Sequence, residues 1–331
     1  MPEYVIGIDI GGSKSHLALF DIDGNYIDFG NWSGLNHEAL EGSFKQFEEE
    51  FKQFAAQTLS RNKITMKQVA FSAIGAAGVD TKQQHIIISD IIKRVGFEKF
   101  TLANDAFLGI PAGSRTGTGI CAINGTGCTL AGLNGKGEML QIGGCGSMTE
   151  DKGGGRYIGL RMISAVYCEL FRKGEPTVMT SLLFEKLGIK SKYDFVEKLY
   201  EKIDDDTFAI HKSSRIMFDA VRQNDKVASN IFREIAANYA DGISCMIEEL
   251  RFPHEEELNI VLAGSVFVKG EHPFLIDSLK EKTFNDNPGR QIIFNILNIP
   301  NAAGAVLWAL NSLGSNNYYD KVCTQLRLNK K

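Results

Sequence analysis

The sequence has no excess of positive charge and no long apolar run. Among its 331 residues, 36 Lys and Arg side chains stand against 40 Asp and Glu, for a formal net charge of −4. Nucleic-acid-binding domains normally carry a basic stripe and a net positive charge, so no nucleic-acid partner is expected. A membrane span needs about 20 consecutive apolar residues. The chain has no such segment, so no membrane association is expected either.

Signals for export and for metal binding are also missing. The opening residues, MPEYVIGIDIGG, have no basic segment, and their apolar run is interrupted at Asp9. They are typical of a strand and not of a secretion signal, which favours a cytoplasmic protein. The six cysteines are Cys121, Cys128, Cys145, Cys168, Cys245 and Cys323. Because they form no C-x-x-C pair, we expect them to be small buried apolar residues and not to form disulfides or a metal site.

The two most familiar phosphate-binding motifs are absent as well. G-x-x-x-x-G-K-[ST] does not occur, because Gly135 and Lys136 are followed by Gly137. No G-x-G-x-x-G follows a strand and opens a helix. The P-loop and Rossmann nucleotide-binding folds are therefore excluded.

What the sequence does contain is an alternation of helical and extended patterns. Apolar residues recur every three to four positions over residues 38–59, 84–95 and 226–250, which predicts amphipathic helices. Short apolar segments bounded by Gly, Asn or Asp predict strands at 4–9, 15–20, 68–74, 100–104, 119–123, 128–133, 258–263 and 291–297. Interleaved strands and helices indicate an α/β protein.

Glycine is abundant, with 34 residues against 7 prolines, and two of its clusters repeat one pattern. Residues 9–25 and 123–138 each read as a strand end, a turn of glycine with a hydroxyl residue, a second strand and a tight turn. Two copies of one hairpin suggest a duplicated fold with a cleft between its halves. Exposed backbone N–H groups in such turns bind anions. The turns are Gly11, Gly12, Ser13 and Lys14, and Asn124, Gly125, Thr126 and Gly127.

Several segments together resemble a known family. GIDIGGSKSHLALF (7–20) and AINGTG (122–127) resemble the two phosphate hairpins of the sugar kinase, Hsp70 and actin superfamily, and IVLAGSVF (260–267) resembles its adenosine-binding turn. More narrowly, GLNH (34–37), AND (103–105), NGTG (124–127) and GGCGSM (143–148) are similar to the N-acetylglucosamine kinase branch, grouped with the BadF/BadG/BcrA/BcrD-type ATPases.

The resemblance implies a fold. It is an α/β fold of two duplicated actin-like (ribonuclease H-like) domains, with mixed sheets flanked by helices and a cleft between the domains. We place the first domain at 1–113 and the second at 114–331, with the last helix able to pack back on the first domain.

The resemblance also implies roles for particular residues. Asp105 would be the base for the attacking hydroxyl; the alternative is a helix N-cap. Asp9 would hold Mg²⁺ through water; the alternative is a turn-stabilising Asp. ATP would be bound by Gly11, Gly12, Ser13, Lys14, Gly125, Thr126, Gly264 and Ser265. The sugar would be bound by Asn36, His37, Asn104, Asp105, Gly127, Gly144, Cys145 and Asp151.

One stretch departs from the family pattern. Where relatives usually read G-D-E-G-S, this chain has Asp151 followed by Lys152, and Arg156 lies four residues further on. Our hypothesis is that Lys152 or Arg156 pairs with an anionic group, such as the lactyl carboxylate of N-acetylmuramic acid. The alternative is a solvated loop cation.

We therefore expect an ATP- and Mg²⁺-dependent kinase acting on the 6-hydroxyl of N-acetylglucosamine, with N-acetylmuramic acid as a second acceptor. A kinase for glucosamine or glucose in the same fold stays open. So does an activator-type ATPase with an iron–sulfur cluster, although the scattered cysteines argue against it. A nucleotide-binding regulator is a third alternative. A homodimer is compatible with the sequence.

Overall fold

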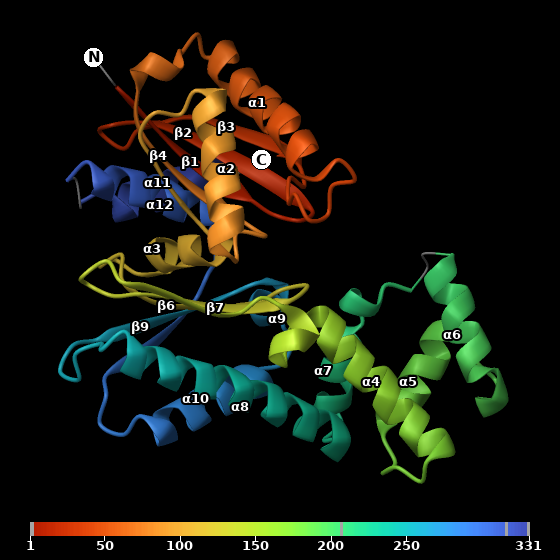
Figure 1. The fold of residues 1–331 in the computed structure, drawn as a ribbon. Helices are drawn as coiled ribbons and strands as arrows, with labels where there is room; N and C mark the ends of the chain where they lie inside the picture. Colours follow the sequence, from red (N-terminus) through yellow and green to blue (C-terminus); the bar gives the residue numbers. More distant parts are fainter. Residues whose placement is uncertain (1–2, 206–207, 315–316, 330–331) are drawn as a thin grey trace. The chain divides into compact units, whose positions relative to one another are not determined.

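The computed structural model describes residues 3–205, 208–314 and 317–329 (Figure 1). They divide into two compact units, which we describe one at a time. Unit 1 comprises Met1–Cys121, Ala131–Glu138 and Leu297–Lys331, and unit 2 comprises Ala122–Leu130 and Met139–Ile296. Residues 114–121, 131–138 and 297–331, which the sequence-based division assigns to the second domain, thus lie in unit 1. For the last helix, this placement is one that the sequence-based division allowed.

The first sheet has five strands in the order β3-β2-β1-β4-β5. The pairs β1–β2 and β2–β3 are antiparallel, whereas β1–β4 and β4–β5 are parallel. The carboxyl ends of β1, β4 and β5 therefore meet at one edge, the place where open α/β sheets bind ligands. The strands are β1 (Tyr4–Ile10), β2 (Lys14–Asp21), β3 (Tyr26–Ser33), β4 (Val69–Ala76) and β5 (Phe100–Ala103).

Helices cover both faces of this sheet (Figure 1). Ile6, Ile8 and Ile10 of β1 are buried in a core shared with the phenylalanines of α1 and the isoleucines of α2. On the opposite face, a Cβ on Gly7 would lie 2.5 Å from the Val306 nitrogen of α11. The helices of unit 1 are α1 (Ser43–Arg61), α2 (Lys82–Val95), α3 (Gly109–Gly113), α11 (Asn301–Ser312) and α12 (Tyr319–Asn329), with short 3-10 turns η1 (Met66–Gln68) and η2 (Asp105–Leu108).

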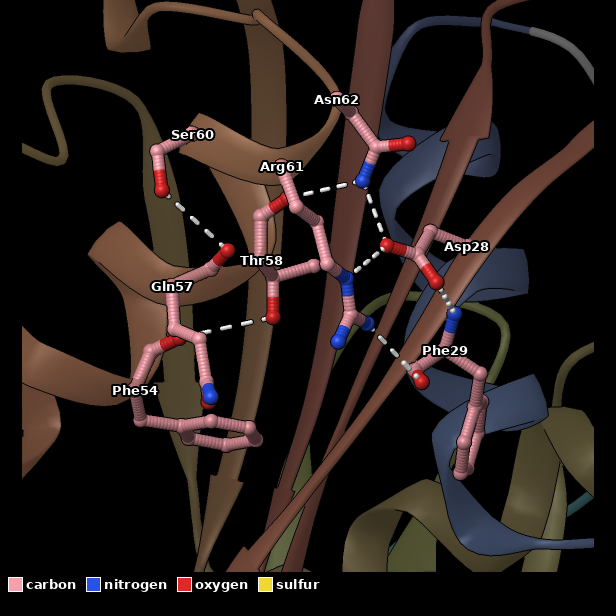
Figure 2. A network of polar contacts seen from close by, with 8 residues as sticks. All are labelled: Asp28, Phe29, Phe54, Gln57, Thr58, Ser60, Arg61 and Asn62. Atoms are coloured by element: carbon pink, nitrogen blue, oxygen red, sulfur yellow. Dashed lines mark hydrogen bonds and ion pairs between the residues drawn. The ribbon is translucent and has the colours of Figure 1, made fainter.

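The end of α1 is fixed to the edge strand β3 by a polar network (Figure 2). The Asp28 carboxylate accepts hydrogen bonds from the side chains of Arg61 and Asn62. Arg61 also donates to the Phe29 carbonyl at 3.1 Å, and Asn62 to the Thr58 carbonyl at 2.8 Å. The helix thus ends where its last side chains reach β3.

The second sheet repeats the strand order of the first. Its order is β10-β9-β6-β7-β8, so β6 occupies the central place of β1 and β9 that of β4. This equivalence confirms the duplicated fold predicted from the two hairpins. The strands are β6 (Gly119–Asn124), β7 (Cys128–Leu133), β8 (Met139–Gly143), β9 (Leu258–Ala263) and β10 (Ile292–Ile296).

Unit 2 carries most of the helices. Two of them, α8 and α10, lie side by side (Figure 1), and the Tyr239 hydroxyl of α8 donates to the Ile123 carbonyl of β6 at 2.7 Å. The helices are α4 (Gly154–Phe171), α5 (Val178–Leu187), α6 (Phe195–Asp204), α7 (Ser214–Arg222), α8 (Lys226–Glu249), α9 (Ser265–Val268) and α10 (Phe274–Asp286), with 3-10 turns η3 (Gly146–Thr149), η4 (Lys192–Asp194) and η5 (Ile210–Lys212). Within the described ranges, no helix is long and apolar enough to cross a membrane.

All eight predicted strands are present, and two of the three predicted helices differ by one or two residues at their ends. The third, predicted from residue 38, begins at Ser43 because turns occupy the preceding loop: Asn36 Oδ1 accepts from the Glu38 N–H, and the Gly42 N–H donates to Gln46.

The cysteine expectation is wrong in part. Cys121 and Cys323 are buried, but Cys145 and Cys245 are exposed; all six are free thiols.

Candidate active site

The first glycine turn joins β1 to β2 in unit 1. The Gly11 N–H donates to the Lys14 carbonyl at 3.1 Å and closes the turn. Gly12, Ser13 and Lys14 are exposed. Within the described chain, the N–H groups of Gly12 and Ser13 donate to no protein acceptor. The turn therefore exposes two backbone donors and the Ser13 hydroxyl, the groups that the predicted anion-binding turn requires.

The predicted sugar loop after β3 lies directly against this turn. The Leu35 N–H donates to the Gly11 carbonyl at 3.1 Å. A Cβ on Gly34 would lie only 2.0 Å from the Gly12 carbonyl oxygen, so only glycine allows this approach. The structure thus brings two predicted groups together, the phosphate turn and the sugar loop.

Two polar side chains of this loop are held in different ways. His37 is 4% exposed and stacks on Phe44 with ring centroids 4.3 Å apart. Burial lowers the pKa of His37, opposed by the charges of Glu38 and Asp80, so a neutral imidazole is favoured. Asn36 is half-buried, and its Oδ1 accepts from the Glu38 N–H at 3.0 Å.

Asn104 and Asp105 lie where β5 ends and η2 begins. The N-cap is Asn104, whose Oδ1 accepts from the Ala106 N–H at 2.9 Å. Asp105 is the first residue of η2, so the N-cap interpretation of Asp105 is wrong. Its carboxylate is not the group that caps this turn.

A glycine in β4 allows Asp105 to approach the end of β1. Gly75 pairs with Asp9 in the sheet. A Cβ at position 75 would lie 2.4 Å from Leu108 Cγ and 3.0 Å from Asp105 Cα. Asp9 itself is half-buried, with Oδ2 3.5 Å from Nδ1 of His16 on β2. The turn with Asp105 can therefore pack against the strand end that bears Asp9 only because position 75 has no side chain.

This packing places negative charges near one another. Burial, followed by the charges of Asp9 and Asp80, raises the pKa of Asp105 to about 7, although the backbone N–H groups of Asp105 and Ala106 oppose the shift. A carboxyl with a pKa near the working pH can both accept and release a proton. Asp105 thus has the electrostatics of a general base.

Sequence reasoning missed Asp80. Its Oδ1 accepts from Asn104 Nδ2 at 2.9 Å, and its charge acts on both Asp105 and His37. The sequence does contain one signal near Asp80, the glycines at positions 75 and 78. Sequence reasoning gave these glycines no role.

In unit 2, the second glycine turn is bonded to the start of α4. Asn124 Oδ1 accepts from the Gly154 N–H at 2.8 Å, and the Gly125 carbonyl accepts from the Gly155 N–H at 2.7 Å. The Arg156 N–H donates to the Thr126 carbonyl at 3.2 Å. Thr126 and the following Gly127 stay exposed, as Gly12 and Ser13 do in unit 1.

The predicted adenosine turn lies beside this hairpin. Gly264, at the end of β9, has φ +86°. A Cβ there would lie 2.4 Å from the Asn124 carbonyl group, so glycine is required by both conformation and space. Ser265 begins α9 and is exposed. The structure therefore also brings the unit 2 phosphate and adenosine candidates together.

The loop after β8 is organised by Asp151. One carboxylate oxygen accepts from the N–H groups of Gly144 and Gly146 at 2.9 and 2.7 Å, and the other accepts from the Thr149 hydroxyl at 2.8 Å. Cys145 lies in this loop with its side chain exposed. Asp151 thus shapes the backbone around Gly144 and Cys145.

Lys152 is not a free cation. Its Nζ lies 3.2 Å from Glu234 Oε1 on α8, and Arg161 contacts the other oxygen at 2.7 Å. Glu234 is thus shared between Lys152 and Arg161, and its one negative charge offsets only part of the positive charge that the sequence suggested for an acidic sugar. Arg156, in the first turn of α4, is exposed and forms no ion pair within the described residues.

The predicted magnesium site has one carboxylate in the structure, Asp9, beside the first glycine turn. Within the described residues, no three His, Cys, Asp or Glu side chains form a group that could hold a metal. Mg²⁺ usually takes only one or two protein carboxylates, together with substrate phosphates and water. A single carboxylate such as Asp9 is therefore compatible with an ion held mainly by substrate phosphates and water.

The repeated strand order and the glycine hairpin after the first strand of each sheet define a protein of the actin-like fold. Solved structures agree. A candidate N-acetylglucosamine kinase from Chromobacterium violaceum matches with a TM-score of 0.65 at 17% identity, covering 92% of this chain and 98% of that one. A ROK hexokinase from Thermus thermophilus matches with a TM-score of 0.60 at 16% identity, covering 94% and 100%.

The family follows from the sequence itself. A model of the BadF/BadG/BcrA/BcrD ATPase family matches residues 6–309, and the chain belongs to this family. It is 27% identical over 310 residues to an N-acetylmuramic acid/N-acetylglucosamine kinase of Clostridium acetobutylicum, covering 93% of this chain and 98% of that protein. It is 25% identical over 319 residues to an N-acetyl-D-glucosamine kinase of Dictyostelium discoideum, covering 94% and 98%.

Proposed function

We propose that this protein is an ATP-dependent amino-sugar kinase that phosphorylates the 6-hydroxyl of N-acetylglucosamine and also accepts N-acetylmuramic acid. The observation that carries the proposal is the raised pKa of Asp105, about 7, which suits a general base. The turn that bears Asp105 is connected through Asp80 to the loop of Asn36 and His37. The names of the two curated relatives support the same substrate class.

In the proposed reaction, the sugar hydroxyl donates its proton to the Asp105 carboxylate as its oxygen attacks the γ-phosphorus of ATP. The bond between the γ-phosphorus and the β,γ-bridging oxygen breaks, and ADP leaves with that oxygen. Phosphoryl transfer needs little covalent work from the protein, so positioning and charge stabilisation dominate. Asn36 and His37 would orient the sugar, since an amide can both donate and accept hydrogen bonds. Asn104 would keep Asp105 directed at the hydroxyl.

The glycine turns would bind the phosphates. The exposed N–H groups of Gly12 and Ser13, which donate to no acceptor among the described residues, would donate to phosphate oxygens. Thr126 supplies a second exposed hydroxyl. Asp9 would hold Mg²⁺ through water, and the ion would neutralise phosphate charge. Gly264 and Ser265 would lie against the adenosine, and the loop shaped by Asp151 against the acetamido group.

A sugar panel tests the proposal. Purified protein with ATP and Mg²⁺ is offered N-acetylglucosamine, N-acetylmuramic acid, glucosamine and glucose, with ADP release coupled to a spectroscopic readout. We expect turnover of the N-acetylated sugars and a loss of at least ~10²-fold in Asp105→Asn, the typical contribution of a positioned base. Asp90→Asn, an exposed acid on α2, serves as the control. Turnover of glucose alone, or an active Asp105→Asn variant, would overturn the assignment.

For the acidic acceptor, Arg156 is the better candidate than Lys152, because Glu234 pairs with Lys152. Arg156→Gln should lower kcat/KM for N-acetylmuramic acid selectively and leave N-acetylglucosamine unchanged. Lys152→Gln is the matched comparison. Equal effects on both sugars would refute a role for Arg156 in recognising the anionic substituent.

A further inference from the structure

The short segment Gly78–Asp80, between β4 and α2, touches both the sugar loop and the Asn104–Asp105 turn. Gly78 and Val79 are buried, and Asp80 is half-buried. A Cβ on Gly78 would lie 2.6 Å from Asn36 Oδ1 and 2.9 Å from His37 Cε1. On its other side, Asp80 Oδ1 accepts from Asn104 Nδ2 at 2.9 Å.

A second connection runs through α2. The Asp80 N–H donates to Gln84 Oε1 at 3.1 Å. The Gln84 Nε2 donates in turn to Glu38 Oε1 at 2.7 Å. Glu38 follows His37 in the sugar loop. The backbone of Asp80 is therefore tied to the sugar loop, while its side chain is tied to Asn104.

We propose that Asp80 is a positioning residue of this active site: it fixes the Asn104 side chain, and with it the turn that carries Asp105, in register with the loop of Asn36 and His37. The inference rests on the proposed kinase function for its kinetic consequences, but its structural core does not depend on that function.

The hydrogen-bond pattern shows why this position needs an acceptor. Asn104 uses Oδ1 to cap η2 through the Ala106 N–H, so its Nδ2 must donate outward. Asp80 supplies the acceptor and fixes which way the amide faces. Without it, the Asn104 amide can rotate, and the cap that orients the start of η2 is lost. Misplacement of a reacting group by about 1 Å can cost ~10²-fold in rate.

Two substitutions separate positioning from charge. In Asp80→Asn the side-chain oxygen remains and can still accept from Asn104. In Asp80→Ala the acceptor is gone. At pH 8.5 with saturating ATP, we expect Asp80→Ala to lose ~10–10²-fold in kcat with a raised KM for the sugar and an unchanged KM for ATP. Asp80→Asn should stay within a few-fold of wild type. Asp90→Ala is the matched control for removing an acid near α2.

Hydrogen exchange of the Ala106 amide, followed by mass spectrometry or NMR, tests the contact between Asp80 and Asn104 independently of enzymatic activity. We expect faster exchange in Asp80→Ala, by about fivefold for the loss of one hydrogen bond, and no change in Asp80→Asn. Circular dichroism and Tm establish that both variants are folded.

The outcomes distinguish the two hypotheses. Equal exchange at Ala106 in Asp80→Ala and wild type overturns the positioning role, as does equal impairment of the Asn and Ala variants. If the wild-type protein phosphorylates no sugar, the proposed function fails, and the exchange experiment still decides the role of Asp80.

Discussion

Replacing Asp105 by Asn should stabilise the protein at alkaline pH while removing its activity. The carboxyl of Asp105 is packed near Asp9 and Asp80, and its pKa is raised from 3.8 to about 7 by burial first and by these two charges next. Cys121 also faces Asp105, as a buried thiol whose own pKa is raised by burial and by Asp105. Asn keeps the size of the side chain and cannot ionise.

The sign and size of this change in the free energy of unfolding follow from proton linkage. Between pH 4 and pH 7 the folded protein holds a proton on Asp105 that the unfolded chain has released. The free energy of unfolding of the wild type therefore falls as pH rises through this interval, and the penalty is complete above about pH 8. At about 1.4 kcal/mol per pKa unit, the penalty is at most about 4 kcal/mol. Because Asp105 is partly exposed, we expect a gain of about 1–4 kcal/mol for Asp105→Asn at pH 8.

The assay is urea or thermal unfolding of wild type and Asp105→Asn at pH 5 and pH 8. The gain should be clear at pH 8, at about 2–4 °C in Tm per kcal/mol, and much smaller at pH 5. Asp90→Asn, which removes an exposed acid paired with Lys93, should show no such pH-dependent gain. If the variant is no more stable than wild type at pH 8, or is equally stabilised at both pH values, then ionisation of Asp105 does not destabilise the folded protein and this prediction is refuted.

Three further predictions concern the same residues and the glycines around them. In wild type, kcat/KM should fall tenfold per pH unit below about pH 7 as Asp105 gains its proton; a flat profile from pH 5 to 8 would contradict a base with this pKa. Gly75→Ala should destabilise the protein by about 1–3 kcal/mol and lower kcat, because its Cβ would meet Leu108 and Asp105. The control is Gly135→Ala, which has open space around its Cβ and should change neither stability nor kcat in matched unfolding and rate assays. Gly264→Ala should raise the KM for ATP or prevent folding, since its Cβ would overlap the Asn124 carbonyl group; an unchanged ATP titration would show that this turn is not near the nucleotide.

Eight of the ten described strands and both glycine turns could be predicted from sequence because their signals are local, whereas the strands β3 and β8 were not predicted. A run such as residues 258–263 is apolar at nearly every position and is fully buried in the second sheet. The turn at Gly11–Lys14 needs only its own residues to form. Asp105 could be proposed because it follows a short strand that ends at Ala103 and because the segment 103–105 resembles a family motif.

Other features depend on contacts between distant residues and left no local signal. Asp80 matters because Asn104 donates to it across 24 positions of sequence. Lys152 forms an ion pair with Glu234, 82 residues further on. The closing segment from Leu297 returns to the first sheet, where Gly7 makes room for α11. Such pairings are decided by the packed fold and not by neighbouring residues.

The cost of the Asp105 charge is itself an argument about function. Asn104 already caps η2, so folding does not require a carboxylate at position 105. An amide there would fill the same space and avoid the proximity of Asp9 and Asp80, which raise the pKa of Asp105. A group that weakens the fold at neutral pH, in a place where a neutral side chain would serve, is best explained by chemistry done there. The stability gain of Asp105→Asn and its loss of turnover are therefore two consequences of one charge, and they should be measured on the same preparation.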